Sequence, residues 1–197
     1  MSMKRLRIHF AGVGGQGTLT ATTLLSKAAL DAGLPMVSGE IHGMAQRGGV
    51  VESTLLVGGW ESPFIGHREA DIVLGFEALE TLRALPYLAP KGSVVSSTDF
   101  VPPPGVSAGR EACPSLEEIR KAVEDCAVKA WFVPCQELGL KAGSGQCANT
   151  VLLGALAATG LIPFGVESLQ EAVRRHLPPK IVDMNVVAVE LGAAAVS

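Results

Sequence analysis

The glycine-rich segment at residues 12–17, Gly-Val-Gly-Gly-Gln-Gly, constrains the fold of this chain more than any other feature. It follows an alternating apolar run over residues 6–11, which predicts a β-strand, and it precedes a helical pattern that begins at Thr18. Such a turn can present backbone N–H groups, and the positive end of a helix dipole, to a phosphate. Its spacing fits G-x-G-x-x-G, so the segment predicts that an anion binds where the strand meets the helix.

Strand and helix patterns alternate along the rest of the chain. Further strands are expected at residues 36–38, 50–57, 70–76, 93–97 and 127–133. Helices are expected at residues 18–32, 78–88, 115–125, 146–159, 166–176 and 181–195, although the valine-rich last segment also suits a strand. Residues 39–49 lack periodicity and are expected to form a loop. The pattern predicts an α/β fold in a single domain over residues 1–197, with a mainly parallel doubly wound sheet, a Rossmann-like glycine turn and a helical C-terminal third.

Composition argues against several classes of function. The chain has a net charge of -3 and no run of lysine or arginine, which argues against nucleic-acid binding. The apolar stretch 151–161 is too short to span a bilayer, and the first residues show no apolar signal segment, so a cytoplasmic protein without membrane contact is expected. Hydrophobic residues make up 48% of the chain and the mean hydropathy is +0.35, which predicts that a partner covers some apolar surface.

The residues that usually carry catalysis or metals form no familiar pattern. The four cysteines, at positions 113, 126, 135 and 147, include no C-x-x-C pair, so no zinc or iron–sulfur site is predicted and reduced thiols are expected. The chain also has no G-x-S-x-G elbow and no P-loop lysine after the glycines. His9, His67 and His176 are scattered and are interpreted as structural.

A second segment with chemical potential is Glu-Ile-His-Gly-Met-Ala-Gln-Arg-Gly-Gly at residues 40–49. It gathers a carboxylate, an imidazole, an amide and a guanidinium at Glu40, His42, Gln46 and Arg47. Because it follows a strand, it is expected at the same sheet edge as the glycine turn. Its arginine could bind a phosphate or a carboxylate through two hydrogen bonds. A surface loop with a satisfied salt bridge, or a subunit contact, is the alternative.

A dinucleotide site is a further alternative for the glycine turn. It needs an acidic residue at the end of the second strand to hold the ribose, and Glu40 is the only candidate at a suitable distance. The double glycine Gly14-Gly15 differs from the plain fingerprint, because it leaves more bare backbone and so a wider nest for an anion.

Three stretches, taken in order, carry a resemblance to a known family. They are residues 12–17, residues 40–49 and the late Asn149…Gly154-Ala155-Leu156. Together they resemble the gamma domain of the 2-oxoacid:ferredoxin oxidoreductases over about residues 8–192. The phrase His-Gly-Met-Ala-Gln-Arg-Gly-Gly, with Arg-Ala-Leu-Pro-Tyr-Leu at residues 83–88, is most similar to the beta subunit in the indolepyruvate ferredoxin oxidoreductase branch of that family.

The resemblance implies an oxidative decarboxylation of a 2-oxoacid, with indolepyruvate or another aryl pyruvate expected as substrate. The 2-oxoacid adds to thiamine diphosphate, loses CO2, passes electrons through 4Fe-4S clusters to ferredoxin and ends as an acyl-CoA. The resemblance also implies a larger alpha subunit that carries thiamine diphosphate, Mg and the clusters. The present chain would be inactive alone, would help to bind CoA and would cover the active site; self-association is left open.

The candidate site residues follow from the resemblance and the two segments. Those expected to contact CoA, or to line the same crevice or the subunit seam, are Gly12, Gly14, Gly15, Gln16, Gly17, Thr18, Glu40, His42, Gln46 and Arg47. No catalytic residue and no metal ligand is assigned to the chain. Two other classes stay open: a free-standing NAD(P)- or FAD-binding Rossmann-type protein, and a non-catalytic scaffold subunit whose glycine turn and arginine loop are subunit contacts.

Overall fold

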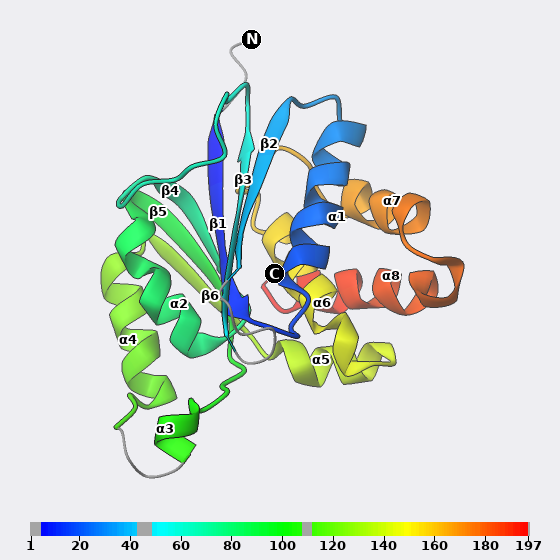
Figure 1. Ribbon diagram of the computed structural model, residues 1–197. Helices are drawn as coiled ribbons and strands as arrows, with labels where there is room; N and C mark the ends of the chain where they lie inside the picture. The colour runs from blue at the N-terminus through cyan, green and yellow to red at the C-terminus, as the bar shows by residue number, and fades with distance from the viewer. Residues whose placement is uncertain (1–4, 43–48, 108–111, 197) are drawn as a thin grey trace.

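A six-stranded sheet forms the centre of the protein in the computed structural model, which describes residues 5–42, 49–107 and 112–196. Its strands are β1 (Leu6–Val13), β2 (Met36–His42), β3 (Val50–Val57), β4 (Ala70–Gly75), β5 (Leu88–Ser97) and β6 (Lys129–Val133). They lie in the order β2-β3-β1-β4-β5-β6 (Figure 1). β1, β4, β5 and β6 are parallel neighbours, whereas β3 is antiparallel to both β1 and β2. The predicted mainly parallel sheet is confirmed, with one antiparallel strand inserted beside β1.

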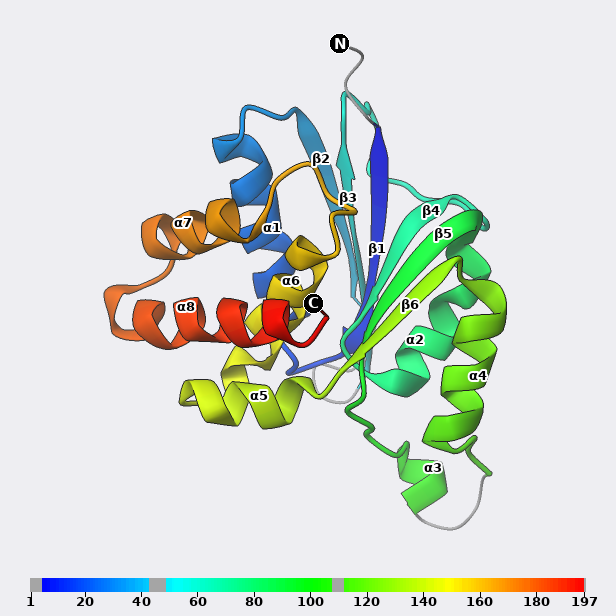
Figure 2. The same ribbon diagram turned by 180° about the vertical axis from the view of Figure 1, so that it is seen from behind.

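Helices cover both faces of this sheet, as Figures 1 and 2 show. One face carries α1 (Thr18–Asp31), α5 (Cys135–Ala142), α6 (Ala148–Ala158), α7 (Val166–His176) and α8 (Pro179–Ala194). The other face carries α2 (Ala78–Ala84) and α4 (Leu116–Cys126), with the short α3 (Pro104–Ser107) beyond one end of α4. The last segment is a helix, so its strand alternative is excluded. In the part of the chain that the structure describes, no helix has the length and apolar character needed to cross a bilayer.

The side chains of β1 divide the interior into two cores. Ile8 and Phe10 face α1 and α6 in the larger core, whereas Ala11 faces α2 and α4 in the smaller one. Because successive side chains of a strand point to opposite faces, His9 lies on the same face as Ala11. The alternation therefore fixes the face of the sheet on which His9 lies, although the residues before and after it in the sequence, Ile8 and Phe10, are both apolar.

Helices α6 and α8 cross with their backbones in contact. A Cβ atom on Gly154 would collide with the backbone of Val189, and one on Gly192 would collide with the carbonyl oxygen of Val151. Only glycine allows the two helices to approach so closely. This crossing fixes α8 beside α6, and the two helices together form one wall of the site described below.

Several predicted boundaries were wrong. The loop expected from residue 39 begins later, because every residue of β2 up to His42 is paired with β3. The helix expected over residues 78–88, bent or ended near Pro86, ends at Ala84 and continues as a 3-10 turn over Leu85–Tyr87, so the break near the proline is confirmed and only the far boundary was wrong. Strand β5 begins at Leu88 instead of residue 93, and helix α5 was not predicted at all.

Candidate functional site

The glycine turn joins β1 to α1 and depends on positive φ angles. Gly15 has φ +103°, and Gly17, the N-cap of α1, has φ +75°, a region that side chains rarely adopt. The side chain of Gln16 stays within the turn, where its Oε1 accepts a hydrogen bond from the Val13 amide at 2.9 Å. The hydroxyl of Thr18 is buried and lies beside Gly12, so neither residue faces outward. The turn is thus held by its own residues and leaves backbone exposed.

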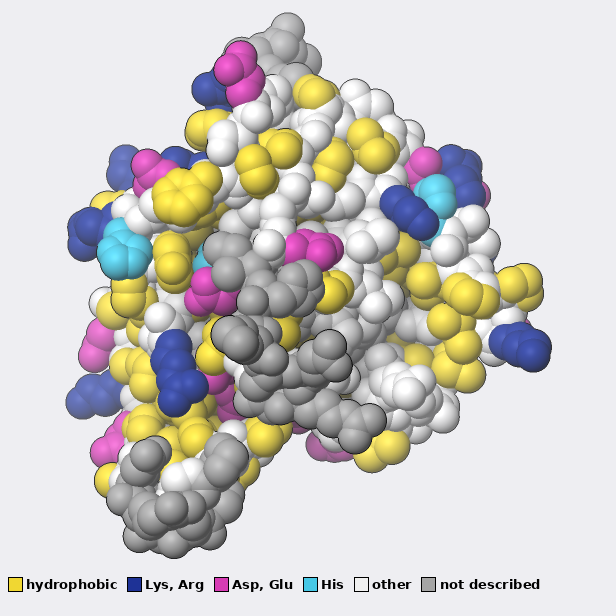
Figure 3. Space-filling view, viewed as in Figure 1, with side chains coloured by type: hydrophobic (Ala, Val, Ile, Leu, Met, Phe, Trp, Pro, Cys, Tyr) yellow, Lys and Arg dark blue, Asp and Glu magenta, His cyan; other side chains and the backbone are white. Residues whose placement is uncertain are grey.

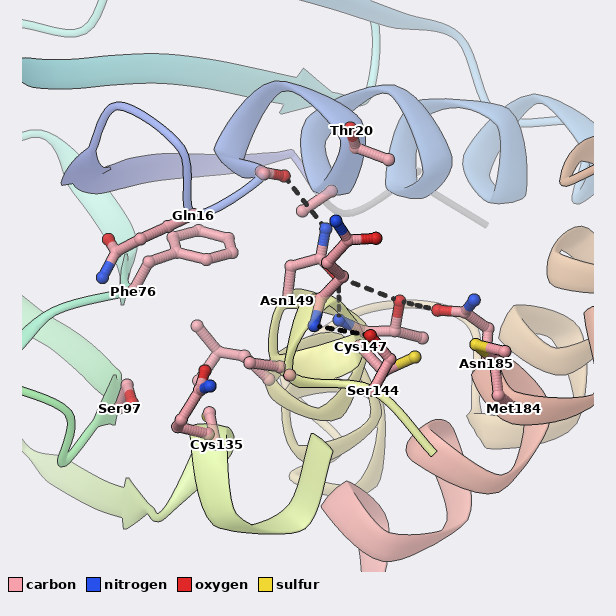
Figure 4. A pocket seen from close by; sticks show the side chains of 18 of the residues that line it. Gln16, Thr20, Phe76, Ser97, Cys135, Ser144, Cys147, Asn149, Met184 and Asn185 are labelled. Atoms are coloured by element: carbon pink, nitrogen blue, oxygen red, sulfur yellow. Dashed lines mark hydrogen bonds between the residues drawn. The ribbon is translucent and has the colours of Figure 1, made fainter. Parts of the chain in front are cut away.

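A chain of hydrogen bonds ties this turn to the C-terminal helices. Asn149, at the start of α6, donates from Nδ2 to the carbonyl oxygen of Gly17 at 3.2 Å. The hydroxyl of Thr150 then donates to Asn185 Oδ1 at 2.6 Å, and Asn185 Nδ2 donates to the Ile181 carbonyl oxygen at 2.7 Å. Figure 4 shows the labelled members of this network from α6 and α8. The network fixes the turn relative to α6 and α8.

A cleft of about 850 Å³ opens beside the turn, between α1 and the helices α5, α6 and α8. Gly15, Gln16 and Gly17 line it at one end. Its other polar lining groups are mostly neutral hydroxyls and amides, from Ser97, Gln136, Ser144, Gln146, Asn149, Thr150 and Asn185 (Figure 4). Asp99 lines the cleft too, and its carboxylate accepts a hydrogen bond from the backbone N–H of Gln136 at 2.9 Å. No lysine or arginine of the described residues lines this cleft.

The N-terminus of α1 is the electrostatically distinctive part of the cleft. Gly17 offers no side chain to cap the first turn, and no side-chain cap is formed. The first amides of a helix have no partner within the helix, and the helix dipole places partial positive charge there. An anionic group in the cleft would therefore find hydrogen-bond donors without any charged side chain.

Exposed apolar side chains border the cleft. Leu140 on α5 is 62% exposed and Ile181 on α8 is 37% exposed, and both line it. Figure 3 shows hydrophobic side chains at the surface around α7 and α8 and also on the α2 and α4 side. That a partner covers this apolar surface remains a prediction.

The second segment meets the glycine turn at its end. The amide of Gly14 donates to the carbonyl oxygen of Gly49 at 2.8 Å, and the end of β2 lies at the same sheet edge as the end of β1. The predicted common edge is therefore confirmed for the described ends of the segment. Gln46, Arg47 and the side chain of His42 lie outside the described residues.

Glu40 occupies a different position from the one expected. It lies within β2 and pairs with Ser53, which in turn pairs with Phe10 of β1. Strand β3 thus separates Glu40 from β1. Along the strand direction, Glu40 lies level with Phe10, three residues before β1 ends at Val13. An acid that holds a ribose would have to lie next to the glycine turn, so Glu40 is poorly placed for a dinucleotide. It lines a separate small pocket instead.

Two of the four free cysteines line the cleft. Burial raises the pKa of the Cys135 thiol to about 12, and it also raises the pKa of Cys147. Both thiols are therefore neutral at pH 7 and poor nucleophiles. Within the described ranges, no three His, Cys, Asp or Glu side chains lie together as metal ligands.

Sequence reasoning missed the environment of His9. This residue is buried against the ring of Tyr87 and lines the small pocket together with Glu52. The signal available was a histidine inside an apolar strand, which is more often a structural residue. The contact with Tyr87 joins positions far apart in the chain, and no motif predicts it.

Comparisons with known proteins agree with this architecture. The family model described as pyruvate ferredoxin/flavodoxin oxidoreductase matches residues 7–195. The indolepyruvate oxidoreductase subunit IorB of Archaeoglobus fulgidus is 39% identical over 188 residues, which cover 95% of this chain and 94% of that protein. The crystal structure of the pyruvate oxidoreductase subunit PORC of Thermotoga maritima has a TM-score of 0.72 at 21% identity, covering 98% of this chain and 97% of that one.

A second solved structure is a longer protein. The 2-oxoglutarate:ferredoxin oxidoreductase from Magnetococcus marinus, with 2-oxoglutarate, coenzyme A and succinyl-CoA bound, has a TM-score of 0.72 at 19% identity. The match covers 98% of this chain and 31% of that one. At such identities the two solved structures show a shared fold.

Proposed function

Because the chain belongs to the pyruvate ferredoxin/flavodoxin oxidoreductase family, and is a subunit of a 2-oxoacid:ferredoxin oxidoreductase, we propose that its enzyme acts on an aryl pyruvate such as indolepyruvate. In the reaction, 2-oxoacid, CoA and two oxidised ferredoxins give acyl-CoA, CO2, two reduced ferredoxins and one proton. The choice of substrate is supported by the 39% identity to an indolepyruvate oxidoreductase subunit over nearly the whole chain.

In the proposed assembly, a larger partner subunit carries thiamine diphosphate, magnesium and the iron–sulfur clusters. The family implies these groups in the complex, and the described residues of this chain do not gather ligands for a metal. Thiamine diphosphate would supply the carbanion chemistry, and the clusters would supply electron transfer. The contribution of this chain would then be to bind and position a co-substrate at the seam between subunits.

The co-substrate proposed for the cleft is CoA. One observation carries this proposal: the cleft opens onto the uncapped N-terminus of α1 at Gly15–Gly17. A CoA phosphate would lie at the helix N-terminus, where backbone amides and the dipole favour an anion. The neutral pantetheine arm would lie along the amides and hydroxyls of Asn149, Ser144 and Gln136, which can pair with its amide groups.

Arg47 has a defined part in this proposal. The cleft has no cationic side chain among the described residues, so the arginine of the second segment would add a positive charge to the backbone donors at the helix N-terminus. Gln46 and His42 would line the same crevice or the subunit seam. The hydrogen bond from the Gly14 amide to the Gly49 carbonyl oxygen supports this arrangement, because it brings the end of the 40–49 segment to the glycine turn.

The test is a calorimetric titration of CoA into the assembled complex, with Gly15→Glu and Arg47→Ala. We expect each variant to weaken CoA binding by at least about tenfold, because one adds a carboxylate beside the helix N-terminus and the other removes a cation. Gly33→Glu is the matched control, since Gly33 also has a positive φ and open space but lies beyond the other end of α1. Unchanged CoA affinity in both test variants would contradict the proposed role.

A further inference from the structure

A small pocket lies on the α2 face of the sheet, on the other side of β1 from the cleft. Its volume is about 170 Å³, and its walls come from β1, β2, β3, the loop after β3 and Tyr87. The hydroxyl of Thr54 donates to the carbonyl oxygen of Pro63 at 2.7 Å, so the loop is held against the sheet and the wall is formed in advance. The volume corresponds to about five or six water molecules, or to one small ligand.

His9 is the buried polar group of this pocket. The residue is 2% exposed, and its ring stacks on Tyr87 with the ring centroids 4.3 Å apart. Neither ring nitrogen has a hydrogen-bond partner in the part of the chain that the structure describes. Burial lowers the pKa of His9 to about 4, so at pH 7 the ring is neutral, with one donor and one acceptor nitrogen. An unpartnered buried polar atom costs about 1–3 kcal/mol, which points to a missing ligand group.

Two carboxylate residues, Glu40 and Glu52, line the pocket, and Glu52 is the one beside His9. Its side chain is 25% exposed, and its Oε1 lies 3.9 Å from Nε2 of His9, too far for a direct hydrogen bond. Within the described ranges, no lysine or arginine forms a salt bridge with this carboxylate, and Arg83 pairs with Glu80 instead, at 2.6 Å. Burial raises the pKa of Glu52, as expected for a carboxylate whose charge lacks compensation.

The remaining walls of the pocket are apolar and aromatic. Pro63, Phe64 and Ile65 come from the loop after β3, and Tyr87 closes the pocket beside His9. Phe64 is 74% exposed while it lines the pocket, so its ring lies at the rim. Aromatic rings attract cations through their faces, and the apolar walls favour a carbon skeleton behind the charge.

These observations lead to one ligand class. We propose that the His9 pocket binds a cationic group on a compact apolar body, such as an arylalkylammonium or the head of a lysine or arginine side chain. The cation lies between the carboxylate of Glu52 and the acceptor nitrogen of His9, and the apolar body lies against Tyr87 and Phe64. An anion of the same size is rejected by Glu52, so the pocket takes neither a 2-oxoacid nor CoA.

The first test uses the full chain and two probes of similar size. 2-Phenylethylammonium and 3-phenylpropionate are titrated separately, and the ring nitrogen signals of the four histidines are followed by two-dimensional 1H–15N NMR. We expect a saturable shift of the His9 signals with the ammonium alone. An absent His9 shift with the ammonium, or an equal response to the anion, overturns the proposal.

Matched variants locate the binding group. Glu52→Gln keeps the shape of the side chain and is expected to weaken ammonium binding by at least about tenfold, because one charge-assisted contact is lost. Glu61→Gln makes the same change on an exposed residue that does not line the pocket, and it is expected to leave the affinity unchanged. Equal affinity of the two variants would overturn the role of Glu52.

A second arm identifies the source of the cation. If a partner subunit supplies it through a lysine or arginine, the assembled complex no longer binds the ammonium, and Glu52→Gln raises the Kd of assembly by at least about tenfold. If the ligand is a free amine, the complex binds the ammonium as the isolated chain does, and assembly is unaffected. Both results support the cationic class, and they separate its two sources. This inference does not depend on CoA binding in the cleft.

Discussion

The cleft at the glycine turn and the His9 pocket lie on opposite faces of β1 and would select ligands by opposite means. The cleft combines neutral amides and hydroxyls with the uncapped N-terminus of a helix. The pocket places a buried imidazole beside a carboxylate. Backbone amides hold an anion without any buried side-chain charge, whereas a site for a cation requires a carboxylate whose burial opposes folding. One strand would therefore serve two proposed sites of different energetic character.

The largest expected effect concerns the packing behind the cleft. Gly192→Ala would place a Cβ against the carbonyl oxygen of Val151 and force α8 away from α6, so we expect a loss of roughly 3 kcal/mol or more in unfolding free energy. Urea unfolding measures the change. Gly165→Ala is the control, because no atom lies within 4 Å of its Cβ position. Similar urea midpoints for the two variants would show that the crossing tolerates a methyl group and that the cleft wall is not fixed by it.

The difference between the two sites explains what sequence could predict. Glycine spacing reports backbone geometry over a few residues, so the turn at residues 12–17 and the helix after it were predicted correctly. The sequence gives no comparable signal for the His9 pocket. Its members come from β1, β2, β3, a loop and a 3-10 turn, and only the fold brings Tyr87 to His9.

Glu40 is a residue whose position the local sequence pattern predicted wrongly. The sequence placed it in a loop near the glycine turn because residues 39–49 lack periodicity. The inserted antiparallel β3 extends β2 by pairing and removes Glu40 from the turn. Strand order is a tertiary property, and local pattern does not encode it. Asn149 likewise donates to the backbone carbonyl of Gly17, a residue that is remote from it in the sequence.

A second prediction tests the pocket through pH. Burial lowers the pKa of His9 from 6.5 to about 4. Between pH 6.5 and pH 4, His9 is therefore protonated in the unfolded chain and neutral in the folded chain. Stability due to His9 is thus complete above pH 6.5 and is lost as the pH falls towards 4, by roughly 3 kcal/mol. Measured against His9→Gln, the unfolding free energy of the wild type should decline over this range. Parallel pH profiles of the two proteins would mean that His9 is not buried as a neutral ring.

A third prediction sharpens the role of the turn. Gly17→Ala forces a positive φ on alanine and directs its Cβ into the side chain of Asn149, so we expect a loss of about 2 kcal/mol and weaker CoA binding. Gly33→Ala is expected to lower the unfolding free energy by only about 1 kcal/mol, because alanine must adopt the positive φ there but nothing lies near its Cβ position.

The double variant Gly17→Ala with Asn149→Ala separates steric overlap from backbone strain. If steric overlap matters, Asn149→Ala lowers the unfolding free energy less in the Gly17→Ala background than it does in the wild type. Denaturant unfolding of the wild type, the two single variants and the double variant measures this difference as a coupling energy. Strictly additive losses would show that Asn149 moves aside without cost and that the Asn149–Gly17 contact does not fix the turn.

The smallest expected effect has opposite signs for stability and binding. Glu52→Gln removes a partly buried charge, so we expect it to stabilise the isolated chain at pH 7, by less than about 1 kcal/mol. A raised pKa means that the folded chain holds the Glu52 proton more tightly than the unfolded chain does. The advantage of the variant should therefore be full at neutral pH and vanish as the pH falls below 4.5. The same variant should weaken binding of 2-phenylethylammonium. A carboxylate that lowers stability is expected where it contacts a ligand. If Glu52→Gln instead lowers the stability of the chain and leaves its affinity for 2-phenylethylammonium unchanged, the His9 pocket is a packing feature, and the cleft would be the remaining candidate ligand site beside β1.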